Sequence, residues 1–279
     1  HNWLVNSKHK ISKLILQARE LNKFHGTFLS SIMRYQINGR IHAEINQLRS
    51  DQGGTVSGRL SMGNPNLQQI PARNKDFGPK IRSLFIPEEG HQWGSFDYSQ
   101  QEPRMTVHYA ASIGEGYEGS QELVDAYKNA SADFHQTVAD LVGIERTQAK
   151  TIGLGLMYGM GKNKLANSLG LTKDEAEILI SKYNRKVPFV KLLSEKCMLT
   201  AQDKGVIRTK RGRKCRFDQW ETKDFGLHLP ETFDNAVAKY GRDNIKRAKT
   251  YKALNRLIQG SAADQTKQAM VDCYKAGHL

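Results

Sequence analysis

The sequence lacks long hydrophobic runs and has few cysteines. No stretch approaches the roughly 18 apolar residues of a membrane helix, so we expect no membrane association. The polar N-terminus has neither a start Met nor the apolar core of a signal peptide, which is typical of the middle of a longer reading frame. Three cysteines, far apart and without a CxxC pair, favour free thiols over disulfides or zinc: Cys197, Cys215 and Cys273.

Acidic residues are scarce relative to basic ones. The chain of 279 residues has 42 Lys and Arg against 28 Asp and Glu, which gives a formal net charge of +14. Such an excess favours a polyanionic partner, most simply nucleic acid. A soluble protein that is merely basic has the same composition, so the charge by itself leaves both interpretations open.

Local patterns in the first third predict one helix and several short strands. Apolar residues recur every three or four positions in residues 8–29, which predicts an amphipathic helix. An Asn-Gly pair between short apolar runs predicts a hairpin within residues 36–48. Residues 80–86 and 93–97 combine branched and aromatic side chains, and they predict two strands.

Capping signals and turns organise the rest of the chain. Asp133 is the expected N-cap of one helix, and Thr172 with Glu175 forms the capping box of another. Residues 205–217 alternate around a glycine and predict a basic hairpin. The C-terminal stretch after residue 245 predicts one long helix or two.

Residues 53–73 are rich in Gly, Ser, Asn and Pro, which predicts a loop with little core of its own. A loop of this length in a compact protein is usually functional or disordered. Arg59, Gln69 and Arg73 supply donors that can contact phosphates, sugars and base edges. The sequence therefore makes this loop a candidate nucleic-acid contact.

One carboxylate, Asp97, stands among aromatic residues where the predicted strand 93–97 ends. Burying a carboxylate costs free energy unless a cation or hydrogen bonds compensate it. Taken alone, Asp97 is either a hydrogen-bonded turn residue or a metal ligand at a strand end, with Glu102 five residues further on. The local pattern does not decide between the two.

Residues 146–161 carry a regular pattern interrupted by glycines. Arg146, Lys150 and Leu154 are spaced by four, so on a helix they share one face, while Tyr158 drifts around the axis. The two glycines inside the pattern oppose a helix by about 1 kcal/mol each. Taken alone, the basic residues are a solvated helix face, and the segment is no P-loop because Ser/Thr does not follow the lysine.

Four segments, in this order, resemble family A DNA polymerases, the Pol I class. The resemblance covers nearly the whole chain and implies a right-hand polymerase fold of the α/β (α+β) class, with an antiparallel palm sheet, helical fingers and the base of a thumb. The four segments are T-V-S-G-R-L-S with N-P-N-L-Q-Q-I-P (55–71), D-Y-S-Q-Q-E-P-R (97–104), R-T-Q-A-K-T-I-G-L-G-L-M-Y-G-M (146–160) and L-I-Q-G-S-A-A-D (257–264). The implied division is 1–30 for the end of the thumb, 31–104 and 245–279 for the palm, and 105–244 for the fingers.

The resemblance also implies roles for single residues. Asp97 and Lys150 are the implied catalytic residues. Asp97 and the backbone carbonyl of Tyr98 are implied to bind two Mg²⁺ ions in the intact enzyme, and oxygen ligands are those that magnesium prefers. Glu102 is similar to a steric gate against a ribose 2′-hydroxyl, and it is implied to hydrogen-bond Tyr158.

Other positions resemble the ligands of the nucleotide and of the DNA. His135, Arg146 and Lys150 are implied to bind the triphosphate, and Leu154 and Tyr158 to lie beside the incoming nucleotide. The implied contacts with primer-template DNA are Arg59, Gln69, Arg73, Asn255 and Gln259.

The implied activity is DNA-templated transfer of a nucleotide from a dNTP to a primer 3′-hydroxyl. We expect a monomer whose partners are primer-template DNA and dNTPs, and the sequence indicates no particular helicase or processivity factor. Gln101, Pro103 and Leu154 replace residues that are commoner in cellular enzymes. They favour a phage replicative enzyme, which acts in the cytoplasm of a bacterial host.

One departure keeps two alternatives open. The family's second catalytic carboxylate lies in a later V-H-D-E-like turn, and the sequence reaches Leu279 before it. We therefore expect these residues alone to be inactive or nearly so. The alternatives are a non-catalytic DNA-binding remnant and a single-subunit RNA polymerase, against which Glu102 as a gate argues.

Overall fold

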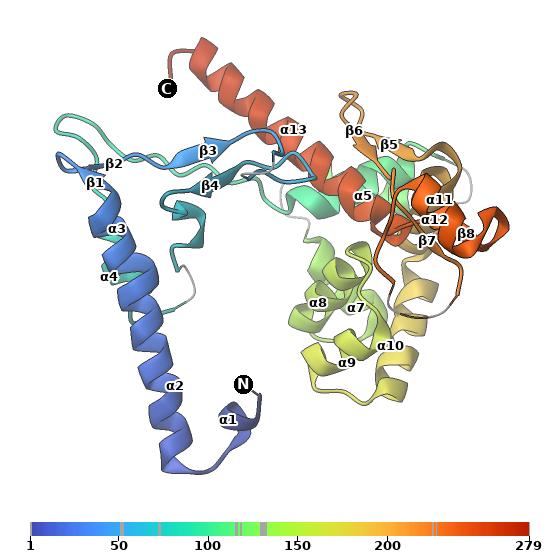
Figure 1. Ribbon diagram of the computed structural model, residues 1–279, viewed down its shortest axis with the longest axis horizontal. Helices are drawn as coiled ribbons and strands as arrows, with labels where there is room; N and C mark the ends of the chain where they lie inside the picture. The colour runs from blue at the N-terminus through green and yellow to red at the C-terminus, as the bar shows by residue number, and fades with distance from the viewer. Residues whose placement is uncertain are drawn as a thin grey trace. The chain divides into compact units, whose positions relative to one another are not determined.

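The computed structural model describes residues 2–50, 53–71, 74–114, 117, 119–128, 133–224, 226 and 228–278. The chain forms two compact units, which meet in the sequence between Asp97 and Tyr98 (Figure 1). The predicted division into four parts stays a prediction. No helix in the described ranges combines the length and the apolar composition needed to cross a membrane.

The first unit begins with helices. The short helix α1 spans Asn2–Asn6, and α2 spans Lys10–Lys23 and continues through a π-helical turn, Phe24–Leu29, into α3, Ser30–Tyr35. This confirms the helix predicted for residues 8–29. The aromatic residues of the π-helical turn form a small core with Phe77, whose ring centroid lies 4.3 Å from that of Phe24.

Short antiparallel strands follow α3. Strands β1, Gln36–Ile37, and β2, Arg40–Ile41, flank a two-residue turn in which Asn38 and Gly39 both have positive φ, so the predicted hairpin is confirmed. Strand β3, Glu44–Asn46, pairs with β4, Ser61–Gly63. The prediction of a loop over residues 53–73 was therefore wrong for β4, because pairing across the chain satisfies its backbone hydrogen bonds despite its poor strand propensity.

Two strand predictions were wrong. Residues 80–86 do not form a strand: the helix α4 spans Gly78–Arg82, with a proline in its first turn and Ile81 buried in the small core. A proline at a helix start supports the helix, since its missing N–H needs no partner there. Residues 93–97 are not a strand either, so Asp97 ends no strand. Trp93 and Phe96 are 70% and 97% exposed, and an aromatic-rich segment forms a stable strand only when it pairs and packs.

The second unit is mainly helical, and its helices surround one hydrophobic core. The largest fully buried side chains include Phe134, Ile152, Tyr183, Phe189 and Leu254, each from a different helix. Its helices are α5 Gln101–Ala111, α6 Ser120–Lys128, α7 Phe134–Val142, α8 Arg146–Met157, α9 Lys162–Leu169, α10 Lys173–Lys186, α11 Pro188–Lys204, α12 Phe233–Tyr240 and α13 Ala253–Lys275.

The predicted caps start two of these helices. The Asp133 side chain accepts hydrogen bonds from the backbone N–H groups of His135 and Gln136, at 2.9 and 3.2 Å. The capping box of α10 is complete, since the Thr172 hydroxyl accepts from the Glu175 N–H and the Glu175 carboxylate accepts from the Thr172 N–H. Both predictions are confirmed.

Helix α8 runs without a break through Gly153 and Gly155, both of which are buried. Here tertiary packing overrides the helix propensity of the two glycines. Helix α13 is one continuous helix of 23 residues, which decides between the two alternatives that the sequence left open. Its N-terminal half packs into the core and its C-terminal end is exposed (Figure 1).

The strands of the second unit form two antiparallel pairs. Strands β5, Val206–Arg208, and β6, Lys214–Arg216, make the predicted basic hairpin. Strands β7, Trp220–Thr222, and β8, Ile245–Arg247, pair across a connection that holds α12. The mixture of helices with small antiparallel sheets agrees with the predicted fold class.

Candidate nucleotide and DNA-binding site

The polar turn that follows Asp97 is held by two side chains. Gln100 adopts a left-handed backbone conformation at the start of α5, and its side-chain oxygen accepts a hydrogen bond from the Phe134 N–H at 2.9 Å. Arg104 donates from Nε to the Ser99 carbonyl at 3.1 Å, and its guanidinium lies 4.3 Å from the ring centroid of Tyr127. The turn is therefore fixed to the start of α7.

Glu102 and Tyr158 are joined by a hydrogen bond, in which the tyrosine hydroxyl donates to a carboxylate oxygen. Glu102 lies in the first turn of α5 and is buried, whereas Tyr158 is the C-cap residue of α8. Figure 1 shows both helices within the second unit. The hydrogen bond predicted between these two residues is confirmed, and the gate function predicted for Glu102 stays a prediction.

Three cationic or titratable residues meet where α7 and α8 begin. Arg146 is the first residue of α8, and its Nε and Nη2 atoms lie 2.8 and 2.7 Å from the same oxygen, Oδ2, of Asp133. His135, two residues after Asp133, is 4% exposed, and no described residue hydrogen-bonds its Nδ1. Lys150 is exposed one turn beyond Arg146 on the same face of α8.

Burial and the neighbouring charges together determine the protonation of His135. Burial lowers the pKa of His135 below its ordinary value, and the Lys150 and Arg146 cations lower it further, while the Asp133 carboxylate opposes them. For Asp133 burial by itself raises the pKa, but hydrogen bonds from Arg146 and from the N-terminus of α7 outweigh it, so the pKa lies below its ordinary value. The free site therefore holds a neutral histidine beside an ionised carboxylate at neutral pH.

From the sequence, Asp133 is predicted only as a helix cap and not as a member of the site. Its contact with Arg146 joins residues thirteen positions apart, which no local pattern reveals. The available signal was a carboxylate two residues before His135. That signal alone does not distinguish a cap from a member of the site.

Leu154 lies on the same face of α8 as Arg146 and Lys150 and is partly buried against the core. The opposite face of the helix is buried through Ala149 and Ile152. The predicted placement of Arg146, Lys150 and Leu154 on one face of α8 is thus confirmed, and the two basic residues face solvent.

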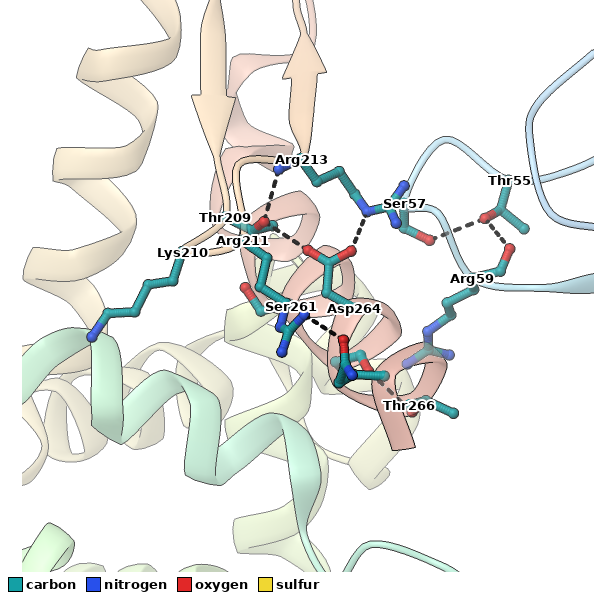
Figure 2. A network of polar contacts seen from close by, with 12 residues as sticks. Thr55, Ser57, Arg59, Thr209, Lys210, Arg211, Arg213, Ser261, Asp264 and Thr266 are labelled. Atoms are coloured by element: carbon teal, nitrogen blue, oxygen red, sulfur yellow. Dashed lines mark hydrogen bonds and ion pairs between the residues drawn. The ribbon is translucent and has the colours of Figure 1, made fainter. Parts of the chain in front are cut away.

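A second polar network joins the β5–β6 hairpin to α13. Figure 2 shows Thr209 and Arg213 pointing toward Asp264, whose two carboxylate oxygens accept from the Thr209 hydroxyl at 2.7 Å and from Arg213 Nε at 2.6 Å. Asp264 is 9% exposed, so these partners compensate a nearly buried charge. No local sequence pattern indicates this pairing. The network fixes the hairpin against α13.

Asn255 and Gln259 lie one turn apart on α13 and are partly exposed, while the neighbouring Leu254 and Ile258 are buried. One face of the helix therefore presents two amides next to the buried core. Between α5, the β5–β6 turn and α13 the second unit also has a hollow of about 690 Å³, lined among others by Tyr98, Gln101, Arg104, Lys210 and Asp272.

The other predicted DNA contacts belong to the first unit. Arg59 is exposed, and its backbone carbonyl accepts from the Thr55 hydroxyl at 2.8 Å (Figure 2). Gln69 is exposed at the end of a short 3₁₀ helix, Leu67–Gln69, which the Asn66 side chain caps. Arg73 lies outside the described residues.

Asp97, the predicted metal ligand, is exposed. In the described part of the chain no three His, Cys, Asp or Glu side chains gather into a group that could hold a metal ion. Magnesium does not require such a group, since it is commonly held by one or two carboxylates together with substrate phosphates. The Asp97 carboxylate and the Tyr98 carbonyl are oxygen donors of that kind.

The chain belongs to the DNA polymerase family A, whose family model matches residues 2–278. It is 38% identical to a DNA-directed DNA polymerase of Pseudomonas phage M6, over 96% of this chain and 44% of the relative. It is 31% identical to the thermostable DNA polymerase I of Thermus filiformis, over 97% of this chain and 30% of that protein.

A solved structure confirms the fold. The polymerase domain of Pol1 from M. smegmatis, in complex with DNA primer-template and dNTP, superimposes with a TM-score of 0.76 at 27% identity. The match covers 99% of this chain and 44% of that one. The right-hand polymerase fold implied by the sequence is therefore confirmed, and the chain spans less than half the length of these relatives.

Proposed function

We propose that the chain forms the nucleotide-binding and primer-template-binding region of a DNA-directed DNA polymerase. The observation that carries the proposal is the arrangement on α5, α7 and α8. There the Glu102–Tyr158 hydrogen bond lies in the same unit as His135, Arg146 and Lys150. The structural relative was solved with primer-template and dNTP, which supports the same role here.

Phosphoryl transfer requires mainly the positioning of reactants and the neutralisation of charge. Arg146 and Lys150, one turn apart on α8, and His135 at the start of α7 supply cationic or proton-donating groups for a triphosphate. Asp97 and the Tyr98 carbonyl would hold magnesium, which neutralises phosphate charge when it is bound. We assign no other residue of this chain to the metal.

Glu102 is suited to discriminate between sugars. Its buried carboxylate is fixed by the Tyr158 hydroxyl, so it can move little to accommodate an additional hydroxyl group. A ribose 2′-hydroxyl placed against it would clash or leave a polar group unpaired, which costs free energy in a buried site. The gate therefore depends on both residues of the pair.

Arg59 and Gln69 in the first unit and Asn255 and Gln259 in the second are proposed to contact the DNA. Exposed or partly exposed amides and a guanidinium can donate to phosphates, sugars and minor-groove acceptors without requiring a particular sequence. The net charge of +14 supports binding that weakens as salt increases.

Leu154 is proposed to reduce contact with the incoming nucleotide, because leucine has less flat surface than an aromatic ring and has no hydroxyl. We infer discrimination against dideoxynucleotides, as well as slower or more selective incorporation. Substitution of Leu154→Tyr in a complete polymerase should raise the incorporation of dideoxynucleotides. An unchanged incorporation ratio contradicts this role.

The proposed function is tested by binding, which does not require turnover. Fluorescence anisotropy would measure the affinity of the 279-residue chain for a labelled primer-template, with and without Mg²⁺ and the next dNTP. We expect the complementary dNTP to tighten the complex, and non-complementary dNTPs or the matching ribonucleotide to have little effect. Glu102→Ala should admit the ribonucleotide.

Controls make this test specific. Lys150→Ala should remove the effect of the dNTP, whereas Lys196→Ala, which deletes an exposed lysine of α11, should not. If DNA binds but the complementary dNTP has no effect, the chain binds DNA without a functional nucleotide site and the proposal is wrong.

The similarity to a phage polymerase supports a phage origin, and with it action in the cytoplasm of an infected bacterium. Expression of a labelled copy during infection, followed by microscopy, would test this location. Signal outside the bacterial cytoplasm would contradict it.

A further inference from the structure

Asp133 divides its two carboxylate oxygens between two helices. Oδ1 accepts from the N–H groups of His135 and Gln136 and so caps α7, while Oδ2 accepts from Nε and Nη2 of Arg146 at the start of α8. One side chain thus contacts the backbone of His135 and the side chain of Arg146. Capping α7 requires only the first of these contacts.

The second contact fixes a long and mobile side chain. Arg146 is about half exposed, and an unrestrained arginine loses rotamer freedom when it binds an anion. The guanidinium of Arg146 is already ordered by this pairing. It has five N–H groups, and the Asp133 carboxylate contacts only its Nε and Nη2 atoms. Donors of the same group can then bind a second anion without releasing the first.

The charge of Asp133 has two opposing effects on an incoming triphosphate. It repels the phosphates, but the neighbouring Arg146 compensates that charge at 2.7 Å. It also orders Arg146 and the first turn of α7, which carries His135. Arg146 compensates the repulsion between Asp133 and the phosphates, whereas the Oδ2 contact is what orders the Arg146 side chain. We therefore expect the ordering of Arg146 to outweigh the repulsion.

We propose that Asp133 is a positioning residue for the nucleotide triphosphate, which acts through Arg146 and holds it in register with His135. The inference rests on the proposed nucleotide-binding function and adds to it a residue that does not itself contact the nucleotide. Asp133 is therefore distinct from the phosphate ligands.

The matched variant is Asp133→Asn. Asparagine caps helices as well as aspartate does, so this change retains the Oδ1 contact and removes the charge that holds Arg146. We expect the thermal midpoint to stay within about 2 °C of the wild type. We also expect the affinity for dATP with Mg²⁺ to fall about fivefold, consistent with the loss of order in one arginine side chain.

A double-mutant cycle separates positioning from a general effect of charge. Isothermal titration calorimetry with dATP and Mg²⁺, and with inorganic tripolyphosphate, would be performed on the 279-residue wild type, Asp133→Asn, Arg146→Lys and the double variant. Lysine keeps the charge but cannot form the two-nitrogen contact. If Asp133 acts through Arg146, Asp133→Asn has little further effect in the Arg146→Lys background.

The outcomes distinguish the inference from the function on which it rests. If Arg146→Lys weakens dATP binding while Asp133→Asn leaves it unchanged or strengthens it, the positioning role is wrong and the nucleotide site stands. Equal effects of Asp133→Asn in both backgrounds also contradict action through Arg146. If neither ligand binds the wild type, the proposed nucleotide site is wrong for this chain, and the inference is wrong with it.

Discussion

Two tyrosines of the second unit should respond in opposite directions to the loss of one hydroxyl group. The Tyr158 hydroxyl donates to the buried carboxylate of Glu102. The Tyr183 side chain is 0% exposed, and no described residue hydrogen-bonds its hydroxyl. Burial also raises the pKa of Tyr183, so its hydroxyl group stays protonated. This polar group therefore lies among buried side chains without a hydrogen-bond partner among the described residues.

The magnitudes follow from these environments. Tyr158→Phe removes a hydrogen bond to a charged group and leaves the Glu102 carboxylate less compensated, which should lower the free energy of unfolding by about 1.5 kcal/mol. Tyr183→Phe removes an unsatisfied buried polar group while keeping the packed ring, and should raise it by about 1 kcal/mol. At roughly 2–4 °C per kcal/mol, the thermal midpoints should separate by about 5–10 °C.

Differential scanning calorimetry and urea unfolding of the wild type and both variants would measure the effects. The slope of the urea transition should remain unchanged, because the surface exposed on unfolding is nearly the same. Each variant is the other's control, since both lose the same atom from the same kind of residue. Destabilisation of similar size in both variants would show that the Tyr183 hydroxyl has a partner and would refute the reasoning.

Three further predictions concern the same unit. Gly153→Ala should stabilise α8 by about 1 kcal/mol, because the new methyl group meets its neighbours at ordinary contact distances of 3.5 and 3.7 Å. Gly155→Ala should stabilise the helix less, since its methyl group would lie 3.1 Å from a methionine sulfur. Chemical denaturation of both variants would measure the difference. Burial lowers the pKa of His135, so as pH falls below about 6.5 this histidine takes up a proton in the unfolded chain before it does in the folded one. The free energy of unfolding, measured from pH 7.5 to 5, should therefore decline. The decline should be shallower in His135→Gln. Asp264→Asn should destabilise the fold by about 2–3 kcal/mol, because it leaves the Arg213 charge unpaired beside α13, and a wild-type melting temperature would contradict the role of this ion pair.

The sequence by itself determined the elements whose signals are local. The helix of residues 8–29, the Asn38-Gly39 hairpin and the caps at Asp133 and Thr172 all depend on residues within a few positions of one another. The motifs that resemble family A polymerases also identified the hydrogen bond between Glu102 and Tyr158. The hairpin and the caps persist in the folded chain because their contacts are short-range. The Glu102–Tyr158 bond joins residues 56 positions apart, so only the family resemblance, and no local pattern, indicated it.

Only the tertiary structure decided the features that join distant residues outside the family motifs. Residues 80–86 have strand-like side chains, yet α4 covers most of them because Ile81 packs against Phe24 and Phe28. Strand β4 forms where the composition predicted a loop, since its partner β3 supplies the hydrogen bonds.

The site follows the same rule. The sequence placed Arg146 and Lys150 on one face of α8, because helical spacing is a local property. It did not reveal that Asp133 binds Arg146 thirteen residues away, or that Asp264 compensates Arg213 fifty-one residues away. Ion pairs of this kind depend on how helices and hairpins pack, and packing is determined by the whole core and not by any single segment.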